Sequence, residues 1–151
     1  MKKIFDSKFQ SVVRLAPLIS VDLLIIDPRD CCLLGKRNNP PAKGSMFVPG
    51  GRILKNEKII EAVNRVLLCE TGHTISEGEN ITFTGVFEHF YNDSYWDSST
   101  STHYVVIAYR IDLVARFTVE SDNQHTYMEW VPCNEIVDRG DVHENVKTYF
   151  K

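Results

Sequence analysis

The sequence lacks the features that mark several large protein classes. No run of lysine and arginine is present and the net charge is −3, so we expect no nucleic-acid partner. No apolar stretch reaches the ~20 residues of a membrane helix, and residues 1–6 become polar too early for a secretory signal. The four cysteines form no CxxC pair and predict neither a zinc site nor a disulfide framework; they are Cys31, Cys32, Cys69 and Cys133. We therefore expect a cytoplasmic protein that does not bind membranes.

What is present has the size and composition of one globular domain. The chain has 151 residues, of which 43% are hydrophobic, which is enough to bury a core without a second domain. No internal repeat or low-complexity linker interrupts it, so residues 1–151 are predicted to form a single domain. The predicted elements are a helix from residue 6 or 7 to before Pro17, strands at 18–26, 31–35, 47–49, 81–91, 102–111 and 127–131, and short helices after 134 and 141. This order predicts an α/β/α sandwich with a mixed β-sheet.

The most informative stretch runs from Gly51 to His73 as G-x5-E-x7-R-V-L-L-C-E-T-G-H. It predicts a helix with Asn56 as N-cap and Glu57 in the first turn. Gly72 suits the left-handed position after the helix. Four apolar residues recur at helical spacing and predict the buried face: Ile59, Ile60, Val63 and Leu67. Arg65 and Glu70 fall outside that face, where a ligand could reach them.

This stretch resembles the Nudix box, whose family hydrolyses nucleoside diphosphates linked to another group with divalent metal held by helix carboxylates. Matching residues are Gly51, Glu57, Arg65, Glu70 and Gly72. Val66 and Cys69 replace two of the three clustered glutamates, and His73 replaces the closing apolar residue. Positions 66, 69 and 70 are predicted to share one helix face. A single carboxylate there cannot hold several hard cations, so the expected fold is the Nudix-type sandwich with fewer metals.

The flanking sequence is similar to one branch of that family, the GDP-mannose mannosyl hydrolases. The matching segments are 9–14, 17–22, 33–37, 47–52, 89–91, 102–106, 124–125 and 142–145. The resemblance implies hydrolysis of GDP-mannose, and of GDP-glucose, by attack of water on the sugar C1 with inversion. GDP and the free sugar are the implied products. It also implies that the protein is a homodimer.

The resemblance implies one magnesium ion per subunit, with manganese as an alternative. Its protein ligands would be the Glu70 carboxylate, the Gly50 carbonyl and the Gln124 amide oxygen, which are hard oxygen donors. Without a metal cluster, another group must take the proton of the attacking water. Among the five histidines, His125 is the expected general base, because it follows Gln124 on a polar loop at 120–126 that suits a lid.

Five further residues are candidates for the substrate site. Asp22 interrupts an apolar strand and would face the substrate, or else pair with a nearby arginine. Arg37 and Arg52 would bind the diphosphate, although a solvated surface position is the alternative for Arg37. The Tyr104 hydroxyl would hydrogen-bond the leaving phosphate, or Tyr104 would simply pack in the sheet. Phe9 would stack on the base or pack in the core.

Two other functions stay open at this stage. A conventional Nudix pyrophosphohydrolase would cleave between the phosphates, but Val66 and Cys69 weaken its metal cluster. A non-catalytic nucleotide-sugar sensor would keep the arginines, but it has no need for both Gln124 and His125. Glu57 and Arg65 are expected to form an internal ion pair that fixes loop to helix.

Overall fold

The computed structural model describes residues 7–119 and 125–151, without the side chains of residues 125 and 126. Its helices are α1 (Ser7–Leu15), α2 (Ile59–Thr71) and α3 (Glu144–Lys147), with 3-10 turns η1 (Cys133–Glu135) and η2 (Thr148–Phe150). Its strands are β1 (Leu18–Ile26), β2 (Cys31–Arg37), β3 (Met46–Phe47), β4 (Gly50–Arg52), β5 (Asn80–Tyr91), β6 (Thr102–Asp112) and β7 (His125–Pro132). Within the described ranges, no helix is both long and apolar enough to cross a bilayer.

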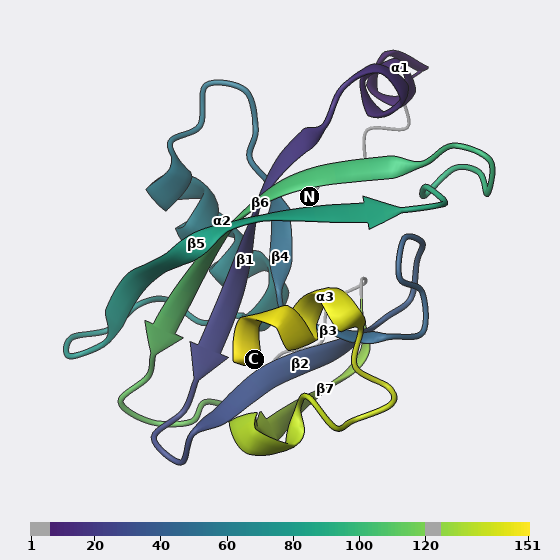
Figure 1. The fold of residues 1–151 in the computed structure, drawn as a ribbon. Coiled ribbons are helices and arrows are strands. Elements are labelled where there is room, and N and C mark those ends of the chain that lie inside the picture. The colour runs from purple at the N-terminus through teal and green to yellow at the C-terminus, as the bar shows by residue number, and fades with distance from the viewer. Residues whose placement is uncertain (1–6, 120–124) are drawn as a thin grey trace.

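Strand β1 is the centre of the sheet (Figure 1). One edge pairs in parallel with β6, from Leu18 opposite Tyr104 to Ile26 opposite Asp112. The other edge pairs antiparallel with β4 near its start and with β2 at its end. Strand β5 extends the sheet beyond β6, and β3 and β7 both pair with β2. The mixed sheet predicted from the sequence is confirmed.

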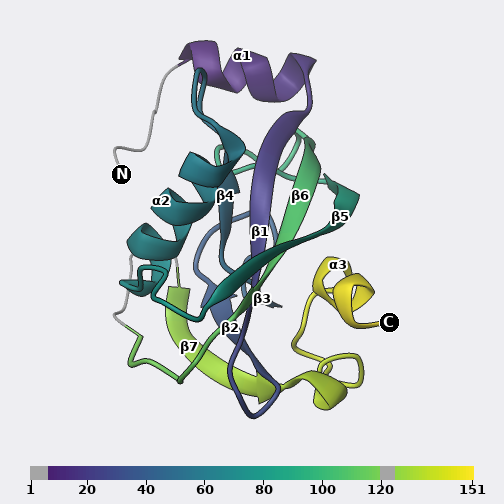
Figure 2. The same cartoon turned by 90° about the vertical axis from the view of Figure 1, so that its left-hand side faces the viewer.

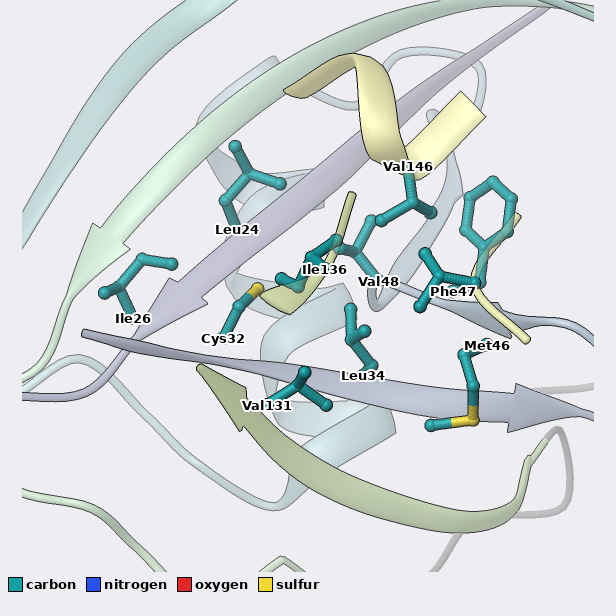
Figure 3. Close-up of a cluster of buried hydrophobic side chains, with 11 residues drawn as sticks. Leu24, Ile26, Cys32, Leu34, Met46, Phe47, Val48, Val131, Ile136 and Val146 are labelled. Carbon is teal, nitrogen blue, oxygen red and sulfur yellow. The ribbon is translucent and has the colours of Figure 1, made fainter. Parts of the chain in front are cut away.

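Alternate side chains of β1 point to opposite sides of the strand, and from Ser20 to Ile26 they are buried on both sides. Val21, Leu23 and Ile25 pack against α2, whereas Leu24 and Ile26 belong to the second core beneath α3. Figure 2 shows α2 and α3 on opposite sides of the sheet, and Figure 3 shows the core on the α3 side. These layers confirm the α/β/α sandwich.

The start of α2 differs from the prediction. Asn56 takes a left-handed conformation with φ 68°, and the helix begins after Lys58. The Glu57 carboxylate lies before the helix and is held by Arg65 and the Leu54 N–H. The Lys58 N–H donates to Glu61 at 2.8 Å, which is the glutamate half of a capping box. The Gly72 prediction is confirmed, since Gly72 has φ 77° and its N–H donates to Leu68 O.

The buried face of α2 is also rotated relative to the prediction. Ile59 and Ile60 are exposed, and the side chains turned inward include small and charged ones: Ala62, Val63, Val66, Leu67, Glu70 and Thr71. The prediction counted only large apolar residues at helical spacing, so it missed Ala62 and Glu70. It therefore placed the buried face too near the N-terminus of the helix.

The last helix starts at a different cap from the one expected. His143, not Asp141, is the N-cap of α3, and its Nδ1 accepts a hydrogen bond from the Asn145 N–H at 3.1 Å. The Asp141 carboxylate binds Arg139 instead. The accepting Nδ1 leaves the proton of neutral His143 on Nε2.

Candidate functional site

Alternation along three strands brings polar side chains together on the α3 side of the sheet. Asp22 on β1 shares a face with Leu24, and Tyr104 on β6 lies opposite His89 on β5. Residues two apart on a strand share a face, so Tyr91 joins His89. The site therefore lies beside the core of Figure 3, which contains Leu24 of β1 and against which Tyr91 and Tyr149 pack.

Asp22 is the buried carboxylate of this group, with 5% of its surface exposed. Burial raises the pKa of Asp22 to about 7, while a hydrogen bond from Tyr149 and the charge of Arg37 act in the opposite direction. The Tyr149 hydroxyl donates to Asp22 Oδ2 at 2.6 Å. The direct partner of Asp22 in the described part is thus a tyrosine, and Arg37 acts as a nearby charge.

Arg37 and Tyr104 lie close enough to influence the same groups. The Arg37 Nε donates to the Pro41 carbonyl at 2.9 Å, which fixes the side chain at the end of β2. Burial raises the pKa of Tyr104, against the favourable charges of Arg37 and Arg52. Arg37, Arg52 and Tyr104 are thus brought near Asp22, as the sequence predicted.

Arg52 meets Phe9 rather than open solvent. Its guanidinium lies 4.1 Å from the centre of the Phe9 ring, a cation–π contact. Burial lowers the pKa of Arg52, with Tyr104 raising it and Arg65 lowering it. Trp96 meets Phe9 edge-on at 5.3 Å between ring centres. The 92–101 loop therefore adjoins Phe9, the residue expected to bind the base.

Gly50 and Glu70, two of the predicted metal ligands, are in direct contact. The Gly50 N–H donates to Glu70 Oε2 at 3.0 Å, and Glu70 is buried rather than accessible as predicted. Gly50 lies in β4, opposite Asp22. A Cβ at Gly50 would stand 2.4 Å from Asp22 Oδ1, so the carboxylate occupies the space of the missing side chain.

The two replaced glutamate positions have different environments. Val66 is buried in the α2 core, where its Cγ2 would stand 3.0 Å from a Cβ on Gly51. Cys69 is exposed, although it neighbours Val66 and Glu70 on α2 as the i, i+3, i+4 spacing predicts. The predicted pair of Glu57 and Arg65 is confirmed, with Nε and Oε2 2.7 Å apart. Arg65 also donates to the Arg52 carbonyl, which ties the helix to β4.

The two residues predicted to act from the 120–126 loop have different outcomes. Gln124 lies outside the described residues. His125 is the first residue of β7 and pairs with Arg37, so it does not lie on a loop. Strand β7 starts two residues earlier than predicted, and its register against β2 shifts between Gly35 and Arg37. The pairing places the His125 backbone beside a residue of the site.

Four aromatic residues of the site were not among the predicted site residues: His89, Tyr91, His143 and Tyr149. Burial lowers the pKa of His89 to about 4, and the neighbouring His143 adds to this. Burial also lowers the pKa of His143 and raises that of Tyr91. Strand alternation opposite Tyr104 could have found His89 and Tyr91. No local pattern marks Tyr149.

Comparison with known proteins identifies the family. Residues 16–150 match the NUDIX domain family. The chain belongs to the Nudix hydrolase family. It is 37% identical over 127 residues to the low-salt glycan biosynthesis protein Agl8 of Haloferax volcanii, covering 84% of this chain and 78% of that protein.

Solved structures support the same fold. The MutT protein of Methanosarcina mazei has a TM-score of 0.68 at 24% identity, covering 89% of this chain and 91% of that one. The NUDIX domain of Shewanella oneidensis NrtR, complexed with ADP ribose, has a TM-score of 0.67 at 16% identity, covering 97% and 96%. At these identities the likeness concerns the Nudix fold alone.

The donor set decides how much metal this Nudix site can hold. In the described ranges, no group of three His, Cys, Asp or Glu side chains could hold a metal ion. Glu70 and the Gly50 backbone lie together, and hard cations are often held by one or two carboxylates plus substrate phosphates and water. These residues therefore fit one such ion.

Proposed function

We propose that this Nudix protein hydrolyses GDP-mannose, and also GDP-glucose, to GDP and the free sugar. Water attacks the sugar C1, and the anomeric configuration is inverted. The carrying observation is the replacement of two helix carboxylates by a core valine, Val66, and an exposed cysteine, Cys69. Glu70 remains as the buried carboxylate of α2. A single carboxylate is not enough to hold the cluster of metal ions that would ionise a water for attack on phosphorus.

The charge distribution supports a diphosphate leaving group. Arg37 and Arg52 both act on Tyr104, and guanidinium groups bind phosphate oxygens in bidentate fashion. Neutralising a nucleoside diphosphate makes it a competent leaving group, so no acid is needed on the departing oxygen. One magnesium ion, or manganese, would be held by Glu70, the Gly50 carbonyl and Gln124, and it would neutralise further phosphate charge.

The chain's own residues supply binding and proton transfer. The water oxygen bonds to C1 while the bond from C1 to the β-phosphate oxygen breaks, and GDP takes the electron pair. The water proton passes to His125, which the pairing with Arg37 supports as a neighbour of the diphosphate. Phe9 would contact the guanine base. Asp22, buried on the α3 side of the sheet, would accept a hydrogen bond from a hydroxyl of the sugar.

The similarity to a protein named for glycan biosynthesis supports a nucleotide-sugar substrate. We further propose that the protein acts in the cytoplasm as a homodimer, as the resemblance implies.

Product analysis in ¹⁸O-water tests the reaction. The protein is incubated with GDP-mannose and magnesium, and the products are separated and their masses measured by mass spectrometry. We expect the label in free mannose and none in GDP. Release of GMP and mannose 1-phosphate with labelled phosphate would instead establish ordinary pyrophosphohydrolase chemistry. Binding of GDP-mannose without turnover would identify a sensor.

A further inference from the structure

The C-terminal turn, the 3-10 turn η2 (Thr148–Phe150), brings Tyr149 into the candidate site. Its hydroxyl donates to Asp22 Oδ2 at 2.6 Å, and the two residues are 127 positions apart in the sequence. Tyr149 Oη also lies 3.3 Å from His89 Nε2. The hydroxyl therefore lies between a buried carboxylate of β1 and a buried imidazole of β5.

The direction of these hydrogen bonds follows from the donors available. A tyrosine has one O–H, and the short contact assigns it to Asp22. The His89 Nε2 must then carry its proton and donate to Tyr149 Oη. The three groups form a chain from His89 to Tyr149 to Asp22, in which each bond polarises the next.

The turn that carries Tyr149 is anchored in the core. Val146 of α3 is fully buried in the cluster on this side of the sheet, as Figure 3 shows. The Tyr149 ring meets Phe87 of β5 edge-on, with 4.8 Å between ring centres. Because the ring is held by packing, the position of its hydroxyl is fixed independently of Asp22.

The second carboxylate oxygen of Asp22, Oδ1, lies next to the backbone of β4. A Cβ on Gly50 would stand 2.4 Å from Asp22 Oδ1, so Oδ1 lies against the Gly50 backbone while Tyr149 holds Oδ2. Rotation about its last bond would remove Oδ2 from Tyr149. A carboxylate fixed in this way presents its oxygens in one direction only.

We propose that Tyr149 is a positioning residue for the sugar end of the site. Its hydroxyl holds the Asp22 carboxylate in the orientation in which it accepts a hydrogen bond from a hexose hydroxyl. This inference rests on the proposed function, because it takes Asp22 to contact the sugar. It adds the C-terminal turn, which is distant in sequence from the Nudix box, to the parts that determine sugar binding.

The test is the Tyr149→Phe variant, which keeps the ring on Phe87 and removes only the hydroxyl. We measure the KM for GDP-mannose and the inhibition constant of GDP, which has no sugar. Loss of this buried hydrogen bond predicts a rise in KM of about tenfold. The inhibition constant of GDP should stay unchanged. An unchanged KM, or an equal rise in both constants, would overturn the proposal.

Tyr109→Phe is the matched control, because Tyr109 packs with the α2 core on the other face of the sheet. It should change neither constant. The KM effect of Tyr149→Phe should also disappear in an Asp22→Asn background, since the two groups act as one unit. Additive effects would contradict coupling. If Tyr149→Phe fails to fold, His89→Phe removes the donor behind Tyr149 and should raise the KM alone, by a smaller factor.

Failure of the proposed function gives a different result from failure of this inference. Cleavage between the phosphates by the wild-type protein would refute the proposed reaction, while the selective effect on GDP-mannose would still support Tyr149. Without turnover, the dissociation constants of GDP-mannose and GDP replace the two kinetic constants and decide in the same way.

Discussion

At the scale of single residues, Gly50 has almost no tolerance for a side chain. A Cβ there would stand 2.4 Å from Asp22 Oδ1 and 2.9 Å from the Val21 carbonyl oxygen. The second contact is with backbone, so a side-chain rotation cannot relieve it. We expect Gly50→Ala to lower the free energy of unfolding by about 1–3 kcal/mol and to abolish turnover, measured by urea denaturation and product release.

Gly140 provides the control for this substitution, since a Cβ there meets no atom within 4 Å. Gly140→Ala should leave stability within about 0.5 kcal/mol of wild type and activity unchanged. Gly51→Ala, with a contact of 3.0 Å to Val66 Cγ2, should fall between the two. A Gly50→Ala protein as stable as Gly140→Ala would refute the steric explanation.

His125 gives a prediction on rate rather than stability. As the proposed general base, its replacement in His125→Gln should lower kcat about 10²–10⁴-fold, measured by release of GDP and mannose. His73→Gln is the control, because His73 binds Glu79 and stacks on Phe117 away from the site. Equal rates for both variants would exclude His125 as the base.

At the scale of elements, Asp27 holds the turn between β1 and β2. Its Oδ1 accepts from the Arg29 and Cys31 N–H groups, and its Oδ2 accepts from Arg116. Burial alone would raise the pKa of Asp27, but these donors lower it below its usual value. Asp27→Asn should therefore cost about 2 kcal/mol of stability at pH 7.

The same carboxylate predicts how stability depends on pH. Because the folded pKa is depressed, its contribution is complete above the unfolded pKa of about 3.9 and is lost as the pH falls through the folded value. Urea denaturation from pH 7 to pH 2 should show a steeper acid loss in wild type than in Asp27→Asn. Asp112→Asn, which breaks an exposed pair with Arg110, should change stability by less than about 1 kcal/mol. Parallel pH curves for wild type and Asp27→Asn would contradict the prediction.

Elements with strong local signals were predicted well from the sequence. Strand β1 has the predicted bounds of Leu18 and Ile26, and α1 ends before Pro17 as expected. The start of α2 was wrong because tertiary contacts decide it: Glu57 binds Arg65 eight residues away, and Asn56 tolerates a positive φ. Its buried face was wrong because Glu70 is turned inward to the Gly50 N–H.

At the scale of the whole molecule, the site depends on contacts that spacing does not encode. The predicted residues Asp22, Arg37, Arg52 and Tyr104 do influence one another. Tyr149 joins them only because the second core brings the end of the chain onto β1 and β5. The sequence therefore identified the four residues that match the Nudix branch, whereas Tyr149, proposed to orient Asp22, is brought to them only by packing.

The exposed apolar residues of the sheet give the last prediction, the place where two copies would meet. Ile19, Val86 and Phe90 are 51%, 60% and 64% exposed. Their partners in β6 are Val105, Ile107 and His103, so they share the face opposite α3. Apolar surface gathered on one face favours association. We expect a mass of twice the 17.3 kDa chain by light scattering, and half of it for the Val86→Lys/Phe90→Lys variant. Thr82→Lys, exposed on the same strand, should remain dimeric, and a monomeric wild type would refute the homodimer.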